Sequence, residues 1–307
     1  MSFFQIIKPW SALENSGPRL AVVVGLLITS VLMGCGGGGS SPSAPGSGTT
    51  ALQVISGVNT TSFIDSTGRD KAVTLIINSD SSNSTNGRFY ALQFSSPEVQ
   101  GEQPNIFTGT ITGIGSSTGI VSDLKGFSIN NNSFTSGSAT FTSPAQGKLK
   151  AEVIQDGNPI NWGNADGIEL ESNASSNSLV GTWTGNLYHP TGVLNSNFSI
   201  TFNRANSNPD NLIFDLQFST FNGVFACRIT TNSTGLASPS PSGVNLYNLS
   251  MELPNATGCL LTAHSQVPIS FSGVAYVTTS PIAGKKRLQL VATTTSDGRG
   301  LSFRADR

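Results

Sequence analysis

The chain has 307 residues, of which 11% are charged and 37% are hydrophobic, and its formal net charge at pH 7 is −1. Such a balance offers nothing that attracts a phosphate backbone, so it argues against nucleic-acid binding. Ser, Thr, Asn and Gly dominate, with Phe and Val interspersed. This composition favours strands and turns over helices.

The first 34 residues have the three parts of a secretory signal peptide. Lys8 and Arg19 supply the positive charge, and an apolar stretch follows over residues 20–33. This stretch has about 14 residues, whereas a membrane-spanning helix needs roughly 20. The sequence therefore predicts a leader that is removed on export, and not a permanent transmembrane segment.

Leu32, Met33, Gly34 and Cys35 resemble the lipobox of bacterial lipoproteins, although Met33 fits its position less well than Ala or Ser would. The resemblance implies cleavage before Cys35 and acylation of its thiol and its new amino group. The alternative is an ordinary secretory signal that happens to contain a cysteine. The acyl chains would anchor the protein firmly in a membrane.

Residues 35–50 comprise the cysteine and a Gly/Ser/Pro-rich segment that cannot bury enough apolar surface to fold, so we expect a tether. Gly36 follows the cysteine where many inner-membrane lipoproteins carry Asp. The resemblance therefore implies the outer membrane of a bacterial cell, with its periplasmic or its surface face left open.

Without the leader, the chain loses Lys8, Arg19 and Glu14, which leaves 14 basic and 16 acidic residues and a net charge of −2. The body that follows the tether, residues 51–307, has 257 residues and exceeds the common size of one domain. We expect a first β domain over residues 51–172 and a second over residues 178–307, joined by a short polar segment.

An internal repeat supports this division. Residues 57–78 resemble residues 181–203 with a one-residue gap, and the shared Leu-Gln-Phe-Ser aligns residues 87–96 with residues 212–220. Further matches follow in the same order, and their common order indicates duplication. The alternative is chance similarity between two Ser/Thr-rich β sequences. These matches join 107–113 to 221–227, 124–129 to 246–251, 136–141 to 272–277, and 148–157 to 287–298.

Each half is expected to form short antiparallel strands in a meander. Ile200 and Phe202 alternate with polar residues, which places one apolar face inward and a mostly polar face toward water. Asp156-Gly157 and Asp297-Gly298 are typical of tight hairpins, because both residue types tolerate positive φ. Closing each meander into an eight-stranded barrel would remove its exposed edges. Two β-sandwiches are the alternative.

Gly181-Thr182-Trp183, at the first strand of the second half, resembles the Gly-x-Trp signature of lipocalins. The resemblance implies that Trp183 plugs one end of the barrel and that Arg304 packs across it. The matching first-half residues, Gly57-Val58-Asn59, have no Trp. The central Thr-Asp-Tyr-like motif of the family is missing, so the resemblance depends on a short motif.

An eight-stranded barrel either is filled by side chains or holds one small ligand. If the second barrel is hollow, we expect a small apolar ligand against its inward aromatic residues. If it is solid, these residues form a core. They are Trp183, Phe198, Phe202, Phe214, Phe218 and Phe225.

Cys227 and Cys259 are the two cysteines after the leader, and in an oxidising compartment such a pair predicts a disulfide. A redox or metal pair is the alternative, with His264 as the nearby histidine. His189, Asp210 and Asp215 fit a polar surface better than an acid–base site. We therefore expect no enzymatic activity and no cofactor. The predicted function is a cell-envelope lipoprotein that binds a small apolar ligand or, alternatively, contacts envelope proteins or glycans.

Overall fold

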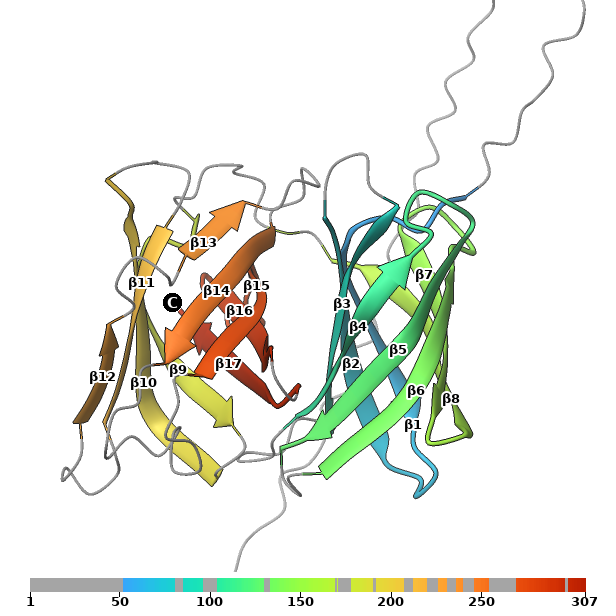
Figure 1. The fold of residues 1–307 in the computed structure, drawn as a ribbon, viewed down its shortest axis with the longest axis horizontal. Helices are drawn as coiled ribbons and strands as arrows, with labels where there is room; N and C mark the ends of the chain where they lie inside the picture. Colours follow the sequence, from blue (N-terminus) through green and yellow to red (C-terminus); the bar gives the residue numbers. More distant parts are fainter. Residues whose placement is uncertain are drawn as a thin grey trace, which may run out of the picture. The chain divides into compact units, whose positions relative to one another are not determined.

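The computed structural model describes residues 52–80, 85–95, 104–129, 133–168, 170, 178–189, 192–206, 212–219, 226–230, 236–239, 246–253, 269–295 and 298–307. In the first half, eight antiparallel strands follow one another around a closed barrel, and the last pairs with the first (Figure 1). The strands are β1 (Gly57–Ile64), β2 (Asp70–Ser79), β3 (Asn86–Ser95), β4 (Asn105–Thr112), β5 (Thr118–Ser128), β6 (Ser133–Thr142), β7 (Lys148–Gln155) and β8 (Asn158–Gly167).

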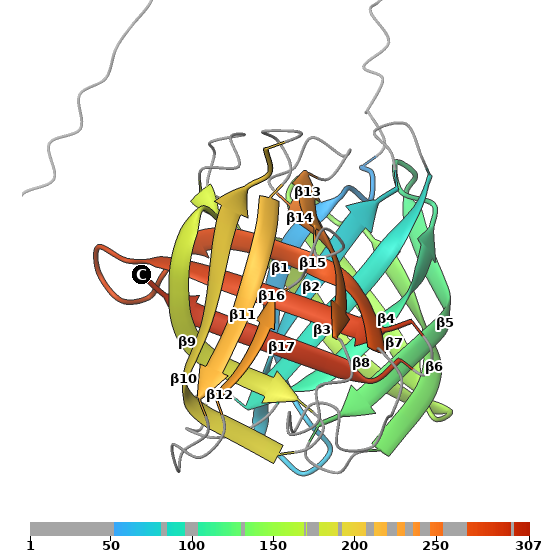
Figure 2. The same ribbon diagram turned by 60° about the vertical axis from the view of Figure 1, so that its left-hand side comes forward.

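The second half closes in the same way. Its strands are β9 (Gly181–His189), β10 (Gly192–Arg204), β11 (Leu212–Ser219), β12 (Ala226–Thr230), β13 (Leu236–Pro239), β14 (Leu246–Leu253), β15 (Ile269–Thr279), β16 (Lys286–Thr294) and β17 (Gly300–Asp306). One edge of β11 pairs with β13 near its start and with β12 near its end, so these two strands share one place in the barrel (Figure 2). Pairing of β10 with β11, and of β17 with β9, completes eight strand positions.

The expected fold is therefore confirmed as two tandem eight-stranded antiparallel barrels, and the sandwich alternative is wrong. Strand register also matches between the halves, since Gly57 pairs with Ile77 in the first barrel and Gly181 with Phe202 in the second. These are the positions that the repeat aligns once its one-residue gap is counted. Sequence similarity over these strands thus reflects equivalent places in two similar barrels.

Alternation along the strands fills the interior of each barrel with apolar side chains. In the first barrel, Leu75, Phe89 and Phe141 are fully buried members of one cluster. In the second, Ile200, Phe202 and Phe303 belong to another cluster of the same kind. Burial of this apolar surface, at about 25 cal/mol per Å², is the main force that holds each barrel together.

The outward face of several strands is not polar as expected. Tyr90, Leu92 and Phe94 of β3 join a third buried cluster, which includes Tyr188 of β9 and Tyr276 of β15. The rings of Phe94 and Tyr188 meet edge to face, with centroids 5.9 Å apart. Described residues of both barrels belong to one compact unit of the chain. Contact between outer faces within that unit explains why these strands are apolar on both sides.

The tight turn predicted at Asp156-Gly157 is confirmed. Asp156 has φ 48° and Gly157 has φ 79°, and the flanking Gln155 and Asn158 pair across the hairpin of β7 and β8. Two positive φ angles match the right-handed twist of the paired strands. Gly298, in the corresponding turn of the second barrel, has φ 80°.

Candidate functional site

Three of the six residues predicted to face the second barrel's interior are described together with their side chains, and all three lie in its core. Trp183, Phe202 and Phe214 are fully buried in one cluster. The rings of Phe202 and Phe214 pack at 5.5 Å between centroids, with an interplanar angle of 43°. These three side chains are in contact with core neighbours on the inside of the barrel, as packed interiors require.

Trp183 closes one end of the second barrel. Its indole Nε1 donates a hydrogen bond to the carbonyl oxygen of Leu179 at 2.8 Å, which satisfies the one polar group of the buried ring. The guanidinium carbon of Arg307 lies 4.1 Å from the ring centroid, and its Nη1 donates to the carbonyl oxygen of Val180 at 2.9 Å. Burial lowers the pKa of Arg307. Together these contacts form a cap over the barrel end.

The expectation that Arg304 packs across Trp183 is wrong. Inward residues of β17 are Leu301, Phe303 and Ala305, so Arg304 points outward and Arg307 has the inward parity. The Arg304 guanidinium instead lies 4.3 Å from the ring centroid of Phe94 on the outer face. A barrel-end arginine is therefore present, three residues further along the chain than the motif suggested.

Gly181 of the Gly-x-Trp motif has a specific reason to be glycine. Its φ is +112°, a conformation that side chains with a Cβ rarely adopt. A Cβ there would also lie 2.5 Å from Nη1 of Arg307. In this motif, Gly181 leaves room for the Arg307 side chain, and Trp183 provides the ring over which the Arg307 guanidinium lies.

The remaining predicted site residues lie outside the part of the structure described in detail. Cys35, Phe225, Cys259 and His264 are outside the described residues altogether. Four others belong to described strands, but their side chains are not among those described, namely His189, Phe198, Phe218 and Cys227. The disulfide between Cys227 and Cys259 and the lipid on Cys35 stay predictions.

The first barrel has a tryptophan that the motif search missed, because it lies on the last strand and not the first. Trp162 of β8 is fully buried, and its ring meets Phe107 edge to face at 5.2 Å and stacks near Phe89 at 6.4 Å. Its Nε1 is buried and has no hydrogen-bond partner among the described residues. β8 pairs with β1 to close the first barrel, and β8 contributes Trp162 to the core. The repeat alignment ends before this strand, so it does not reveal this residue.

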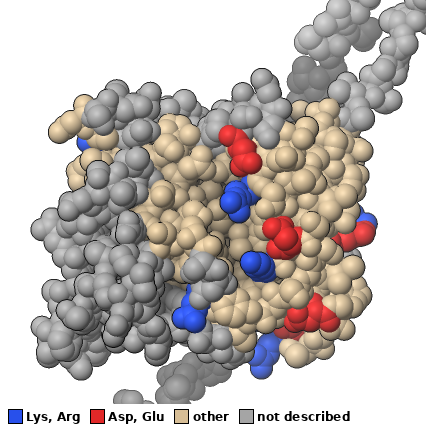
Figure 3. Space-filling view, in the orientation of Figure 1, with Lys and Arg blue, Asp and Glu red and all other residues tan. Residues whose placement is uncertain are grey.

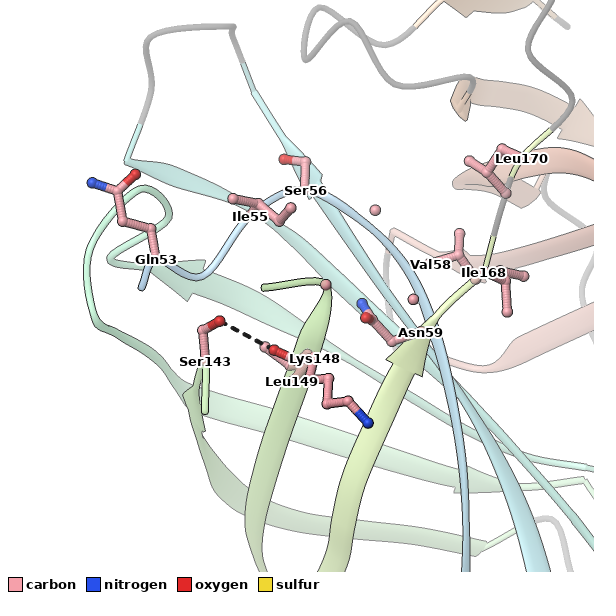
Figure 4. A pocket seen from close by; sticks show the side chains of 13 residues that line it. Gln53, Ile55, Ser56, Val58, Asn59, Ser143, Lys148, Leu149, Ile168 and Leu170 are labelled. Atoms are coloured by element: carbon pink, nitrogen blue, oxygen red, sulfur yellow. Dashed lines mark hydrogen bonds between the residues drawn. The ribbon is translucent and has the colours of Figure 1, made fainter. Parts of the chain in front are cut away.

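Asn59 occupies the place in β1 that Trp183 occupies in β9, and the barrel end around it is hollowed. A pocket of about 400 Å³ is lined there by residues of β1, β8 and the turn between β6 and β7. The turn is held by Ser143, whose hydroxyl donates to the carbonyl oxygen of Lys148 at 3.1 Å. Figure 4 shows the Asn59 amide pointing toward the side of the pocket that Ile55 and Lys148 line, while Ile168 lies on the other side of β1.

A second pocket, of about 820 Å³, borders the first barrel near the turns that join β1 to β2 and β7 to β8. Gln93, Asn105 and Gln155 contribute amide groups to it, and Phe63 and Ile160 contribute apolar surface. Asp65 caps its own turn there, accepting hydrogen bonds from the backbone and hydroxyl of Thr67 at 2.8 and 2.6 Å. The hydroxyl bond holds the pKa of this carboxyl below its usual value.

Charged groups are sparse, and the described ones on the face shown in Figure 3 are of both signs. An ion pair joins Arg287 to Asp306 across β16 and β17, with two hydrogen bonds of 2.8 Å. These bonds hold the pKa of Asp306 below its usual value. Desolvation raises the pKa of Tyr90 and of Tyr276 in the outer apolar cluster.

Within the described ranges, no group of three or more His, Cys, Asp or Glu side chains is placed to hold a metal ion. The same ranges contain no helix long and apolar enough to cross a membrane. Comparison with protein-family models, with curated proteins and with solved structures finds no match for this chain. The resemblance of residues 181–183 to a lipocalin motif stays a prediction, and the eight-stranded antiparallel barrel is the part that the structure confirms.

Proposed function

We propose that this protein is a non-enzymatic lipoprotein of the bacterial cell envelope and that its barrels form a binding module. The leader and Cys35 motivate the anchor. The observation that carries the binding role is the pocket of about 400 Å³ at the end of the first barrel, because its volume lies in the range of small-molecule sites. Its counterpart in the second barrel is covered by Trp183 and Arg307.

The anchor is tested first by the intact mass of the protein isolated from membranes. A product that begins at Cys35 and carries the mass of the added acyl chains is the expected result. The Cys35→Ser variant is the control, and it should keep its leader or lose membrane attachment. An unacylated wild-type product would refute the lipoprotein part of the proposal and would leave the binding part standing.

For the second barrel, the sequence leaves both a ligand cavity and a solid core open, and we propose the solid core. Support comes from Trp183, Phe202 and Phe214, which are fully buried against other core side chains. A hydrophobic fluorescent probe distinguishes the two readings. Saturable probe binding that is lost in Phe202→Ala, while Phe141→Ala in the first barrel has no effect on it, would restore the apolar-ligand role.

A role in contacting envelope proteins or glycans is the alternative. It is favoured by the larger pocket of the first barrel, whose rim carries Gln93, Asn105 and Gln155. Amide side chains both donate and accept hydrogen bonds, so they suit polar uncharged surfaces. Cross-linking in intact cells tests it, because a contact module should yield one reproducible partner.

A further inference from the structure

Equivalent ends of the two barrels are built differently at three positions. Asn59 pairs with Gly167 at the end of the first barrel. In the second barrel, Ala305 pairs with Gly185, and the same register carried two residues further places Arg307 opposite Trp183. The Trp–Arg pair of the second barrel is thus replaced in the first barrel by Asn59 and Gly167.

The third difference concerns the residue two places before the strand. In the second barrel, Leu179 is fully buried and its carbonyl holds the Trp183 indole. In the first barrel, the corresponding Ile55 is 59% exposed and lines the pocket. Loss of the indole and the guanidinium therefore leaves space and an uncovered apolar wall at the same barrel end.

Asn59 is the polar group inside that space. Only 8% of its surface is exposed, and its amide has no hydrogen-bond partner among the residues that the structure describes. The Asn59 amide is not among the described side-chain groups that are both shielded from solvent and unpaired, so it reaches the open space of the pocket. Its donor and acceptor edges are therefore available to a molecule that enters the pocket.

We propose that this pocket binds a small uncharged molecule that carries an amide group on an apolar body. The proposal rests on the binding role proposed above and names its site and ligand class. The Asn59 amide offers one donor edge and one acceptor edge, which match the two edges of another amide. Leu149, Ile168 and Leu170 provide the apolar wall. Lys148 is paired with Asp166 at 3.0 Å, so charge does not select the ligand.

Titration of the isotopically labelled full-length protein with butanamide, followed by NMR, tests this directly. The signal of the Asn59 side-chain amide is expected to shift and to saturate at millimolar concentration, because a ligand of six heavy atoms has a limited affinity. The ketone 2-pentanone has the same shape but lacks the amide N–H. It should bind at least about threefold more weakly. No saturable shift, or equal affinities for the two probes, would overturn the proposal.

Asn59→Leu is the decisive variant, with Asn164→Leu on the exposed part of β8 as its matched control. Removing the amide should weaken butanamide binding about tenfold or more, while the control binds as the wild type does. The Tm of Asn59→Leu should stay the same or rise, because no internal hydrogen bond is lost. A clear fall in Tm would show that Asn59 is structural and would overturn the proposal.

Asn59→Trp provides a second, independent variant. It rebuilds the ring that closes the second barrel and should fill the pocket, so butanamide binding should disappear. If this variant does not fold, Asn59→Leu still decides. The intact-mass experiment on Cys35 has a separate readout, so failure of the amide site and failure of the anchored lipoprotein are distinguishable.

Discussion

The two buried tryptophans provide a matched pair of perturbations, Trp183→Phe and Trp162→Phe. Both rings are fully buried, and both substitutions remove a similar volume from an aromatic core. They differ in the bonding of Nε1 and in the Arg307 guanidinium, which lies over the ring of Trp183. Nε1 of Trp183 donates a 2.8 Å hydrogen bond to the carbonyl of buried Leu179, whereas Nε1 of Trp162 is buried with no partner in the part of the chain that the structure describes.

Loss of volume should cost both variants a similar amount, about 1–2 kcal/mol. Trp183→Phe also leaves a buried carbonyl unpaired, which adds about 1–3 kcal/mol. Trp162→Phe removes an unsatisfied buried donor, which offsets part of its cost. We therefore expect Trp183→Phe to lower the free energy of unfolding by about 2 kcal/mol more than Trp162→Phe does.

Urea unfolding followed by far-UV circular dichroism measures this difference, because the strand signal reports on both barrels. Fluorescence adds a local readout, since each variant keeps the tryptophan of the other barrel. Equal losses of stability at Trp183 and Trp162, or a larger loss at Trp162, would refute the assignment of hydrogen bonding at these two indoles.

Three further predictions follow from the second half of the chain. Gly181→Ala should lower the free energy of unfolding by more than about 1 kcal/mol, measured by urea unfolding, because its φ of +112° is strained for a residue with a Cβ, and the Arg307 side chain would have to shift as well. Asp306→Asn should cost about 1 kcal/mol at pH 7 and much less at pH 2. The hydrogen bonds from Arg287 lower the pKa of Asp306 in the folded protein. The stability that this carboxylate contributes is therefore present above its unfolded pKa and is lost as the pH falls through its folded pKa. A cost of Asp306→Asn that does not change with pH would contradict this reasoning. Non-reducing peptide mapping should find Cys227 joined to Cys259, and two free thiols in the exported protein would exclude that bond.

Sequence patterns predicted the strands, the turn at Asp156-Gly157 and the closure into barrels, because each depends on local alternation or on turn chemistry. They also predicted equivalent faces where the repeat is well aligned. Ala139 and Ala275 both face a barrel interior, as do Leu149 and Leu288. In these strands only one face is apolar, so the alternation of residues decides which side chains face the barrel interior.

The repeat failed where both faces of a strand are apolar. Its shared Leu-Gln-Phe-Ser aligns Tyr90 with Phe214, yet Tyr90 lies in the outer cluster and Phe214 in the second barrel's core. A shift of one residue moves a side chain to the other face of a sheet. Phe127, aligned with Leu249, shows the same inversion. Alternation cannot detect the error, because neither face of β3 is polar.

The pocket at Asn59 was out of reach for a related reason. The sequence shows that the first half lacks the tryptophan of the Gly-x-Trp motif, but it does not show what lies in the place of that ring. The meaning of this absence depends on Arg307 and Gly167, whose pairing partners are set by strands far apart in the sequence. The strand pairing that closes each barrel shows that the tryptophan absent from the first half corresponds to an open barrel end.

Tyr90, Phe94 and Tyr276 belong to the apolar cluster on the outer faces of the barrels. In an isolated barrel, the residues that it contributes to this cluster would be exposed to water. A chain cut between residues 171 and 177 would expose aromatic strips of this kind to water. Each fragment would then be prone to self-association, even with its own hydrogen-bonded ring intact. Closure of a barrel leaves no unpaired strand edges, but in this protein each barrel also needs the other half of the chain to cover its outer apolar residues.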